Sequence, residues 1–377
     1  MAREPDSVYR RRRLVAVAVL AVAALATVII IVGIGGGDGS QPSPAADPYA
    51  DVALDRLIGQ RLMVRMGGEV TTELLEAARG GTIGGVILFP PAGAEPAGLA
   101  DQVARLQRAA TRGGNPPLLV AIDQEGGDVK RLRAGPPKRS ASQLGAAGDA
   151  AASSAQGEAT ASYLAQAGVN VDLAPVLDVA APGSFVSGRA FSDDPGVVAE
   201  IGVAFAEGLQ RGGVAATAKH FPGLGLASVN TDFAPSVVAA PRSDVRSGIE
   251  PFEAAVAAGV DLVMVANATY TALDADVPAA LSERVVSHEL RDRIGYDGVV
   301  ITDDLEAGSI TATRTAEDAA VDAARAGADV LLFAKRATPD PIAAALARAA
   351  RRGALDRASL EAAYGRIVAL KDAVAAG

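Results

Sequence analysis

Two segments of the chain end an apolar, β-branched run in ionisable residues. Lys219–Gly223 (Lys-His-Phe-Pro-Gly) closes the run 214–218, and Asp303-Asp304 closes the run 299–302. Parallel α/β barrels build their catalytic sites from charged side chains at the C-terminal tips of strands. A carboxylate at such a tip is suited to covalent catalysis. The two segments therefore predict an enzyme that acts on a polar substrate.

Further ionisable residues lie at or beyond the ends of other apolar runs. Asp123 follows the third run, Asp172 and Asp178 flank the fourth, and Arg189 lies in the loop after it. Because the C-terminal ends of barrel strands meet at one face, we expect these side chains to gather at one mouth. Together they offer the donors and acceptors that sugar hydroxyls require.

Eight short apolar runs alternate with Ala-, Arg- and Glu-rich helical stretches. The runs cover residues 62–66, 85–89, 118–122, 169–174, 214–218, 261–266, 299–302 and 329–333. Eight strand–helix units predict an α/β fold of the (β/α)₈ TIM-barrel type. A doubly wound open sheet is the rival, but no Gly-x-Gly-x-x-Gly turn follows the first run. The stretch 339–375 is expected to form helices that cover the barrel.

Composition narrows the classes of function. The chain has 377 residues, 50% of them hydrophobic and only 4% aromatic, which suits an Ala/Gly-rich α/β core. A net charge of −9 argues against a nucleic-acid partner. No cysteine is present, and no His or Asp spacing indicates a metal site. The sequence predicts neither a metal nor a cofactor.

The N-terminus predicts a membrane anchor. Residues 1–13 form a basic tail that we place in the cytoplasm, and the apolar run 14–34 is long enough to span a bilayer as a single-pass signal anchor. Residues 35–50 read as a Gly/Pro/Ser linker, and residues 51–377 as one domain. A cleaved signal peptide is the alternative, although its apolar core is usually only about 7–15 residues. The domain is expected outside the cell membrane in either case, and secreted if the segment is cleaved.

Five motifs along the domain carry a resemblance. In order they are Asp123–Gly127 with Arg131, Ala174–Asp178, Gly188–Phe191, Lys219–Gly223 and Thr302–Leu305. The chain resembles glycoside hydrolase family 3, in its single-domain β-N-acetylhexosaminidase branch. The resemblance implies that Asp303 is the nucleophile, and that the non-reducing sugar is held by Asp123, Arg131, Arg189, Lys219 and His220. It also implies a carbohydrate substrate, with terminal β-linked N-acetylglucosamine of cell-wall glycans as the first expectation.

The chain departs from the family pattern where that pattern places its acid/base. The family usually continues Lys-His-Phe-Pro-Gly with His-Gly, and a few residues later has Asp-Ser-His, whose histidine transfers the proton. Here Leu224 replaces the first histidine, Asn230 the aspartate and Asp232 the catalytic histidine. Asp128 stands where an arginine is usual, and Asn267 where a histidine is usual. The expected site is therefore poorer in cations and imidazoles.

Three consequences of these replacements compete. Asp232 takes over as acid/base, which is ordinary chemistry for a glycosidase; or it is a vestige that braces a turn in a glycan-binding module; or proton transfer comes from another group. We favour hydrolysis, because the predicted nucleophile is present. Asp304 is the neighbouring alternative to Asp303, but adjacent strand residues face opposite ways, so only one is expected in the mouth. His288 is expected on the surface.

One further alternative ranks last. Lys335-Arg336 after the eighth run suggests a phosphate-binding barrel, but no Gly-rich turn accompanies it.

Overall fold

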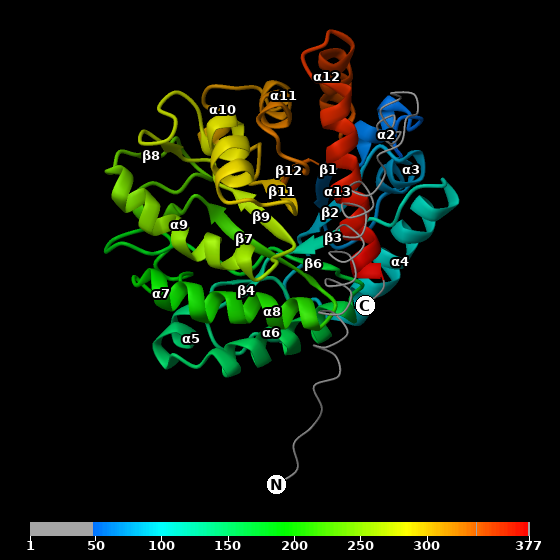
Figure 1. Cartoon of the computed structure of the whole chain (residues 1–377). Coiled ribbons are helices and arrows are strands. Elements are labelled where there is room, and N and C mark those ends of the chain that lie inside the picture. The colour runs from blue at the N-terminus through cyan, green and yellow to red at the C-terminus, as the bar shows by residue number, and fades with distance from the viewer. Residues whose placement is uncertain (1–47, 337, 376–377) are drawn as a thin grey trace, which may run out of the picture. The chain divides into compact units, whose positions relative to one another are not determined.

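The central feature of the fold is a ring of eight parallel strands (Figure 1). The computed structural model describes residues 48–336 and 338–375. Its barrel strands are β1 (Leu62–Met66), β2 (Gly85–Leu88), β3 (Leu119–Ile122), β6 (Val171–Asp172), β7 (Ala215–Phe221), β9 (Leu262–Val265), β11 (Val299–Thr302) and β12 (Leu331–Phe333). Each lies on one of the eight predicted runs, and only β7 continues beyond its run, to Phe221.

The strand order closes the sheet almost into a barrel. The neighbours run β11-β9-β7-β6-β3-β2-β1-β12. The two end strands meet through a parallel bridge between Ile301 and Val330, and the Thr302 N–H donates to the Val330 carbonyl at 3.0 Å. The predicted α/β barrel architecture is therefore confirmed, and the open sheet is not observed.

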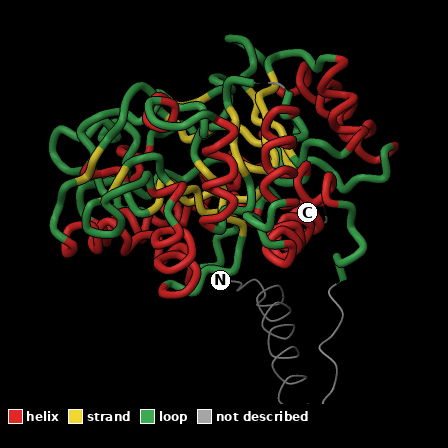
Figure 2. The backbone as a smooth tube through the Cα atoms, turned by 90° about the horizontal axis from the view of Figure 1, so that it is seen from above, coloured by secondary structure: helices red, strands yellow, loops and turns green. Residues whose placement is uncertain are grey.

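Helices surround the strands, which gather in the middle of the view from above (Figure 2). The α-helices are α2 (Leu54–Gly59), α3 (Thr72–Gly80), α4 (Pro96–Arg112), α5 (Ala141–Ala147), α6 (Ala150–Ala165), α7 (Pro195–Val197), α8 (Val203–Arg211), α9 (Arg242–Ala257), α10 (Gly308–Thr311), α11 (Ala316–Ala326), α12 (Asp340–Arg351) and α13 (Arg357–Ala375). The π-helical segments η1 (Val198–Gly202) and η4 (Arg284–Arg293) and the 3₁₀ turns η2 (Leu224–Leu226) and η3 (Ala279–Leu281) complete them. Small pairs β4 (Gln124–Gly126) with β5 (Val129–Lys130), and β8 (Val237–Val238) with β10 (Thr269–Tyr270), lie outside the barrel sheet.

The period-two alternation of each strand builds two apolar layers. In β3, Leu119 and Ala121 belong to the cluster inside the barrel, while Val120 and Ile122 pack in the outer layer under the helices. Successive strand side chains point to opposite faces, so a continuous apolar run serves both layers. Ile367 and Leu370 of α13 join the inner cluster. The C-terminal helix thus covers the barrel interior, as expected for residues 339–375.

Buried charges tie the C-terminal helices to the barrel. Asp329, at the entry to β12, is fully buried and accepts hydrogen bonds from Arg366 of α13 at 2.8 Å and from Arg291 of η4 at 2.5 Å. Lys371 of α13 is also buried, and its ammonium donates to Gln60 Oε1 at 2.6 Å. Burial lowers the pKa of Lys371 to about 7. These groups stabilise one end of the barrel. The strand tips that carry the predicted site lie at the opposite end.

The expected anchor 14–34, with the tail 1–13 and most of the linker 35–50, lies outside the described residues. Within the described part of the chain, no helix is long and apolar enough to cross a membrane. The domain boundaries at the N-terminus therefore remain predictions.

Candidate active site

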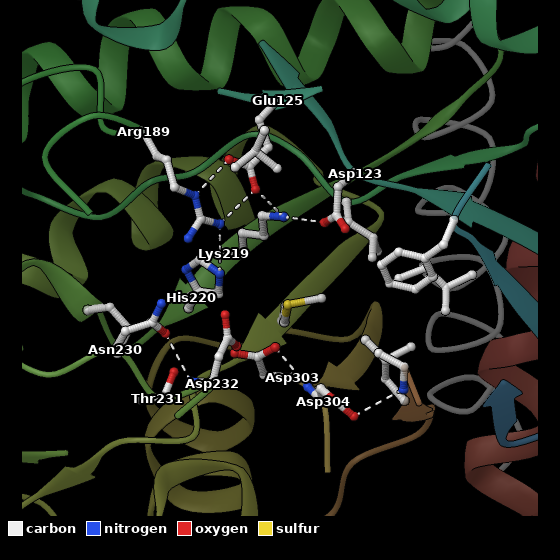
Figure 3. Close-up of a pocket in the computed structure, with 18 of the residues that line it drawn as sticks. Asp123, Glu125, Arg189, Lys219, His220, Asn230, Thr231, Asp232, Asp303 and Asp304 are labelled. Carbon is white, nitrogen blue, oxygen red and sulfur yellow. Dashed lines mark hydrogen bonds and ion pairs between the residues drawn. The ribbon is translucent and has the colours of Figure 1, made fainter. Parts of the chain in front are cut away.

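A pocket of about 430 Å³ opens at the C-terminal ends of the strands (Figure 3). It is lined by a side chain from nearly every strand tip: Arg65, Phe89, Asp123, Glu125, Arg131, Arg189, Lys219, His220, Asn230, Asp232, Phe233, Asp303, Asp304 and Lys335 are among its residues. All seven residues predicted from the sequence as catalytic or sugar-binding are in this set. The strand tips have brought them together, as the fold requires.

Lys219 is the centre of an ion-pair network in one wall of the pocket. Its ammonium lies 2.9 Å from Asp123 Oδ1 and 2.6 Å from Glu125 Oε1. Arg189 forms a two-pronged pair with Glu125 at 2.7 and 2.8 Å, and Arg131 reaches Asp123 Oδ2 at 3.0 Å. Figure 3 shows Lys219 between the two carboxylates. Three cations and two carboxylates thus brace one another.

The network fixes its own charge state. Burial alone would raise the pKa of Asp123 and Glu125, but Lys219, with Arg131 at Asp123 and Arg189 at Glu125, holds both below their usual values. In return, the carboxylates raise the pKa of Lys219, against burial. Because the Lys219 side chain is only 2% exposed, removing one of its carboxylate partners would leave a buried charge without compensation. The wall therefore offers rigid donors and acceptors to a polyhydroxylated ligand.

His220 faces the same pocket because β7 is irregular at its tip. The pairing of β7 with β9 shifts between Lys219 and Phe221, and both Lys219 and His220 line the pocket. The His220 ring is held by Asp178, with Nδ1 at 2.8 Å from Oδ2. Asp178 Oδ1 also accepts the backbone N–H groups of His220 at 3.1 Å and Leu224 at 2.7 Å. Asp178 therefore orients the imidazole and the turn after β7.

Asp303 follows directly after β11 in the opposite wall. Its Oδ1 accepts the backbone N–H of Asp304 at 2.7 Å, while the other oxygen has no hydrogen bond within the described residues. Burial raises the pKa of Asp303; the Asp232 carboxylate adds to the rise, whereas His220 opposes it. One oxygen is thus positioned and one is left for a ligand.

Asp304 also lines the pocket, contrary to the expectation that only one of the two aspartates would. Strand alternation does not reach them, because β11 ends at Thr302. Asp304 Oδ1 is engaged by the backbone N–H groups of Glu306 and Ala334, both at 3.0 Å. Burial raises the pKa of Asp304 to about 6. Its carboxylate therefore links the loops that follow β11 and β12.

Asp232 is carried by a short turn anchored at both ends. Its backbone N–H donates to Asn230 Oδ1 at 2.9 Å, so the amide that replaces the family's usual aspartate supports the turn. The carbonyls of Thr231 and Asp232 accept the N–H groups of Ser309 and Gly308 at 3.0 and 2.9 Å. The Asp232 carboxylate lies beside Asp303 and below His220 (Figure 3). Two carboxylates therefore stand together across the pocket from the Lys219 network.

Some expectations are corrected in detail. Asp172 does not line the pocket: it is buried, its Oδ1 accepts the Gln124 N–H at 3.0 Å, and burial raises its pKa to about 8. Asp128 is exposed and outside the pocket lining. His288 is exposed on η4, as predicted.

Sequence reasoning assigned no role to Glu125, which lines the pocket. Glu125 is the shared partner of Lys219 and Arg189; the signal available was its place two residues after Asp123, on the same face of an extended segment. Asn267, already noted in the sequence where a histidine is usual, is buried outside the pocket lining and donates to the Asp304 carbonyl at 2.7 Å. Within residues 48–336 and 338–375, no three His, Asp or Glu side chains are arranged to hold a metal ion.

Sequence relatives share this domain. The chain matches the glycosyl hydrolase family 3 N-terminal domain over residues 53–370. A protein of Arthroderma benhamiae described as an uncharacterized secreted glycosyl hydrolase is 38% identical over 271 residues, which cover 69% of this chain and 76% of the relative. A beta-hexosaminidase of Xanthomonas oryzae is 34% identical over 255 residues, 65% of this chain and 75% of that protein.

Solved structures agree. A family 3 β-N-acetylglucosaminidase from Paenibacillus sp. FPU-7 matches with a TM-score of 0.83 and 36% identity; the match covers 86% of this chain but 63% of the Paenibacillus chain, less than two thirds. A β-N-acetylhexosaminidase from Beutenbergia cavernae matches with a TM-score of 0.80 and 34% identity over 86% of this chain and 99% of its own. The resemblance read from the five motifs is confirmed. The chain belongs to glycoside hydrolase family 3 and is a glycoside hydrolase related to the β-hexosaminidases of that family.

Proposed function

We propose that the chain hydrolyses terminal β-linked N-acetylglucosamine with retention of configuration, using Asp303 as nucleophile and Asp232 as acid/base. The observation that carries the proposal is the placement of these two carboxylates together in the pocket, opposite the Lys219 network. A retaining glycosidase needs one carboxyl group that attacks and a second that transfers a proton, on either side of the bond to be cut.

The free oxygen of Asp303 attacks the anomeric carbon. The bond from that carbon to the leaving-group oxygen breaks, and protonated Asp232 gives its proton to this oxygen. The product is a glycosyl ester of Asp303. Ionised Asp232 then takes a proton from water, the water oxygen attacks the anomeric carbon, and Asp303 leaves as a carboxylate.

The net charge of the pair Asn230 and Asp232 is suited to proton transfer. An Asp–His pair with a neutral imidazole carries one negative charge and becomes neutral when it gains a proton. An Asn–Asp pair passes through the same two charge states. An aspartate retained at position 230 would instead set a second carboxylate beside Asp232. The amide at 230 supports the backbone of Asp232 without adding charge, which favours an active site over a vestige.

The network residues are proposed to hold the non-reducing sugar. Asp123, Arg131, Arg189, Lys219 and His220 present alternating acceptors and donors to hydroxyl and acetamido groups. A carboxylate acid/base would also repel inorganic phosphate as an acceptor, so water is the favoured one. N-acetylglucosamine is the proposed sugar because the Paenibacillus relative is a β-N-acetylglucosaminidase.

Cell-wall glycans are the proposed source. The Arthroderma relative is described as secreted, and an extracytoplasmic barrel would have access to such glycans. Attachment to the membrane through residues 14–34 stays part of this proposal.

The test is turnover of 4-nitrophenyl N-acetyl-β-glucosaminide by the purified chain and its Asp303→Ala variant. This leaving group needs little protonation, so the assay examines the nucleophile without depending on Asp232. Loss of the nucleophile should reduce kcat by about 10⁴-fold or more. Asp304→Asn is the matched control, since its amide oxygen can still accept the N–H groups of Glu306 and Ala334.

Near-parental turnover by Asp303→Ala would refute the nucleophile assignment. A folded parent that turns over no N-acetylglucosaminide but binds the sugar would favour the alternative, a glycan-binding module. The observation that keeps this alternative open is the aspartate at position 232, where the family usually has histidine.

A further inference from the structure

The side chain of Phe233 is left almost entirely in water at the rim of the pocket. It is 81% exposed, yet it is one of the residues that line the pocket. The other exposed large hydrophobic residues of the described chain are Leu226, Val229 and Val237, all on the same segment. Leaving a phenylalanine ring in water forfeits the gain of burial, so a ligand that covers it would recover that gain.

The backbone of Phe233 is fixed by contacts with neighbouring residues. Its N–H donates to the Asn230 carbonyl at 3.2 Å. The Phe233 carbonyl oxygen packs closely against Gly308. A Cβ added to Gly308 would lie only 2.2 Å from that oxygen. The turn that fixes Asp232 thus fixes the backbone of the next residue as well. A ring presented from such a backbone can act as a platform without first being ordered by the ligand.

Phe233 belongs to the exposed, outer part of the pocket. Lys219, at 2% exposure, marks the deep wall, whereas Asp232 and Phe233 are exposed at the mouth. The acid that protonates the glycosidic oxygen must sit beside that oxygen, and the oxygen carries the leaving group outward. Phe233 follows Asp232 in the chain and lines the pocket at its rim, so it lies in the region that the leaving group enters.

We propose that Phe233 is a specificity-determining platform on which the leaving-group sugar stacks the apolar face of its ring. The substrate class is then oligosaccharides whose leaving group is a pyranose, in preference to glycosides of small alcohols. This inference rests on the proposed function, because it uses Asp232 to locate the leaving group. Asn230 and Gly308 set where the platform stands.

Hydrolysis of two substrates by the purified chain and by Phe233→Ala tests the platform. N,N′-diacetylchitobiose has a pyranose leaving group, whereas methyl N-acetyl-β-glucosaminide has none, yet both need protonation by the acid. Phe233→Ala should lower kcat/KM for the disaccharide about three- to tenfold, mainly through KM, and leave the methyl glycoside unchanged. Phe233→Trp should restore the disaccharide, and Val237→Ala, an exposed residue outside the pocket, should alter neither.

The two substrates separate the platform from a merely structural role. Equal slowing of both would mean that the substitution displaced Asp232, and it would overturn the platform. If Phe233→Ala changed kcat/KM for neither substrate, the platform would be overturned as well.

A binding measurement separates this inference from the proposed function. If the parent hydrolyses neither substrate, the proposed function fails, and the Kd of N,N′,N″-triacetylchitotriose relative to N-acetylglucosamine is measured by calorimetry. If Phe233→Ala raises the Kd of the trisaccharide but not that of N-acetylglucosamine, the platform is supported. If the substitution raises both Kd values equally, or neither, the platform is overturned.

Discussion

The backbone N–H of Gly308 donates a hydrogen bond to the carbonyl oxygen of Asp232 at 2.9 Å. Gly308 begins α10, in the same connection that starts with Asp303 after β11. Together with the Ser309 N–H, which donates to the Thr231 carbonyl at 3.0 Å, this contact sets the distance between the two proposed catalytic carboxylates. Glycosidase chemistry is sensitive to that distance, since about 5–5.5 Å separates the carboxyl groups of retaining enzymes.

Gly308→Ala should separate these loops. The added Cβ would lie 2.2 Å from the Phe233 carbonyl oxygen, a backbone atom that moves only if the turn moves. We expect kcat/KM for chitobiose to fall about tenfold to 10²-fold, because a displacement near 1 Å costs that much. Gly98→Ala in α4 is the control, since its Cβ would meet nothing within 4 Å. Parental kinetics in Gly308→Ala would show that the contact does not position Asp232.

Asp232→Ala should act according to the leaving group. Chitobiose needs a proton on its departing oxygen, so its rate of hydrolysis should fall about 10²- to 10⁴-fold. A 2,4-dinitrophenyl glycoside departs unaided, so its first step should be little changed. Azide should then accelerate turnover of the aryl glycoside by attacking the glycosyl ester without needing a base. Equal slowing of both substrates, without rescue by azide, would contradict the acid/base role.

The ionisation of Asp303 gives a pH prediction. Burial and the charge of Asp232 raise the pKa of Asp303, and Asp303 must be ionised to attack. Asp232→Asn removes that charge and therefore lowers the pKa of Asp303. The acid limb of kcat/KM for the dinitrophenyl glycoside should move to lower pH in this variant. Asp128→Asn, which removes an exposed carboxylate outside the pocket, should leave the limb in place; a shift as large as that of Asp232→Asn would rule out the pairing.

The barrel could be predicted because its signal is local. Each strand must be apolar on both faces, and eight such runs with intervening helices permit few arrangements. The pocket members followed, because strand tips converge wherever the barrel closes. Asp303, Lys219 and His220 needed no knowledge of distant contacts.

The remaining details depend on contacts between distant loops. Glu125 meets Arg189 across 64 positions of sequence, and no periodicity reports that meeting. Gly308 rests on Phe233 only because two loops of different strands come together. Asp172 was expected at the pocket because it lies at a strand end. Its side chain instead accepts the Gln124 N–H and does not line the pocket. Position at a strand tip predicts proximity to the mouth, and the direction of the side chain decides the rest.

Lys371 gives a prediction about stability rather than chemistry. Burial lowers the pKa of Lys371 to about 7 in the folded chain, whereas in the unfolded chain the lysine keeps its proton up to its ordinary pKa of 10.5. Between these values the unfolded state binds one more proton, so the free energy of unfolding rises with pH. Above about pH 7 the neutral amine can still donate to Gln60 Oε1.

Lys371→Met removes this titration. The difference in unfolding free energy between parent and variant should shift in favour of the parent by about 1.4 kcal/mol per pH unit between the two pKa values. Urea unfolding of both proteins at pH 6, 8 and 9.5 measures that slope. The slope does not depend on how well methionine packs, because packing adds the same constant at every pH. A difference that stays flat from pH 6 to 9.5 would mean that Lys371 keeps its proton in the folded protein, and that Gln60 alone compensates a buried charge.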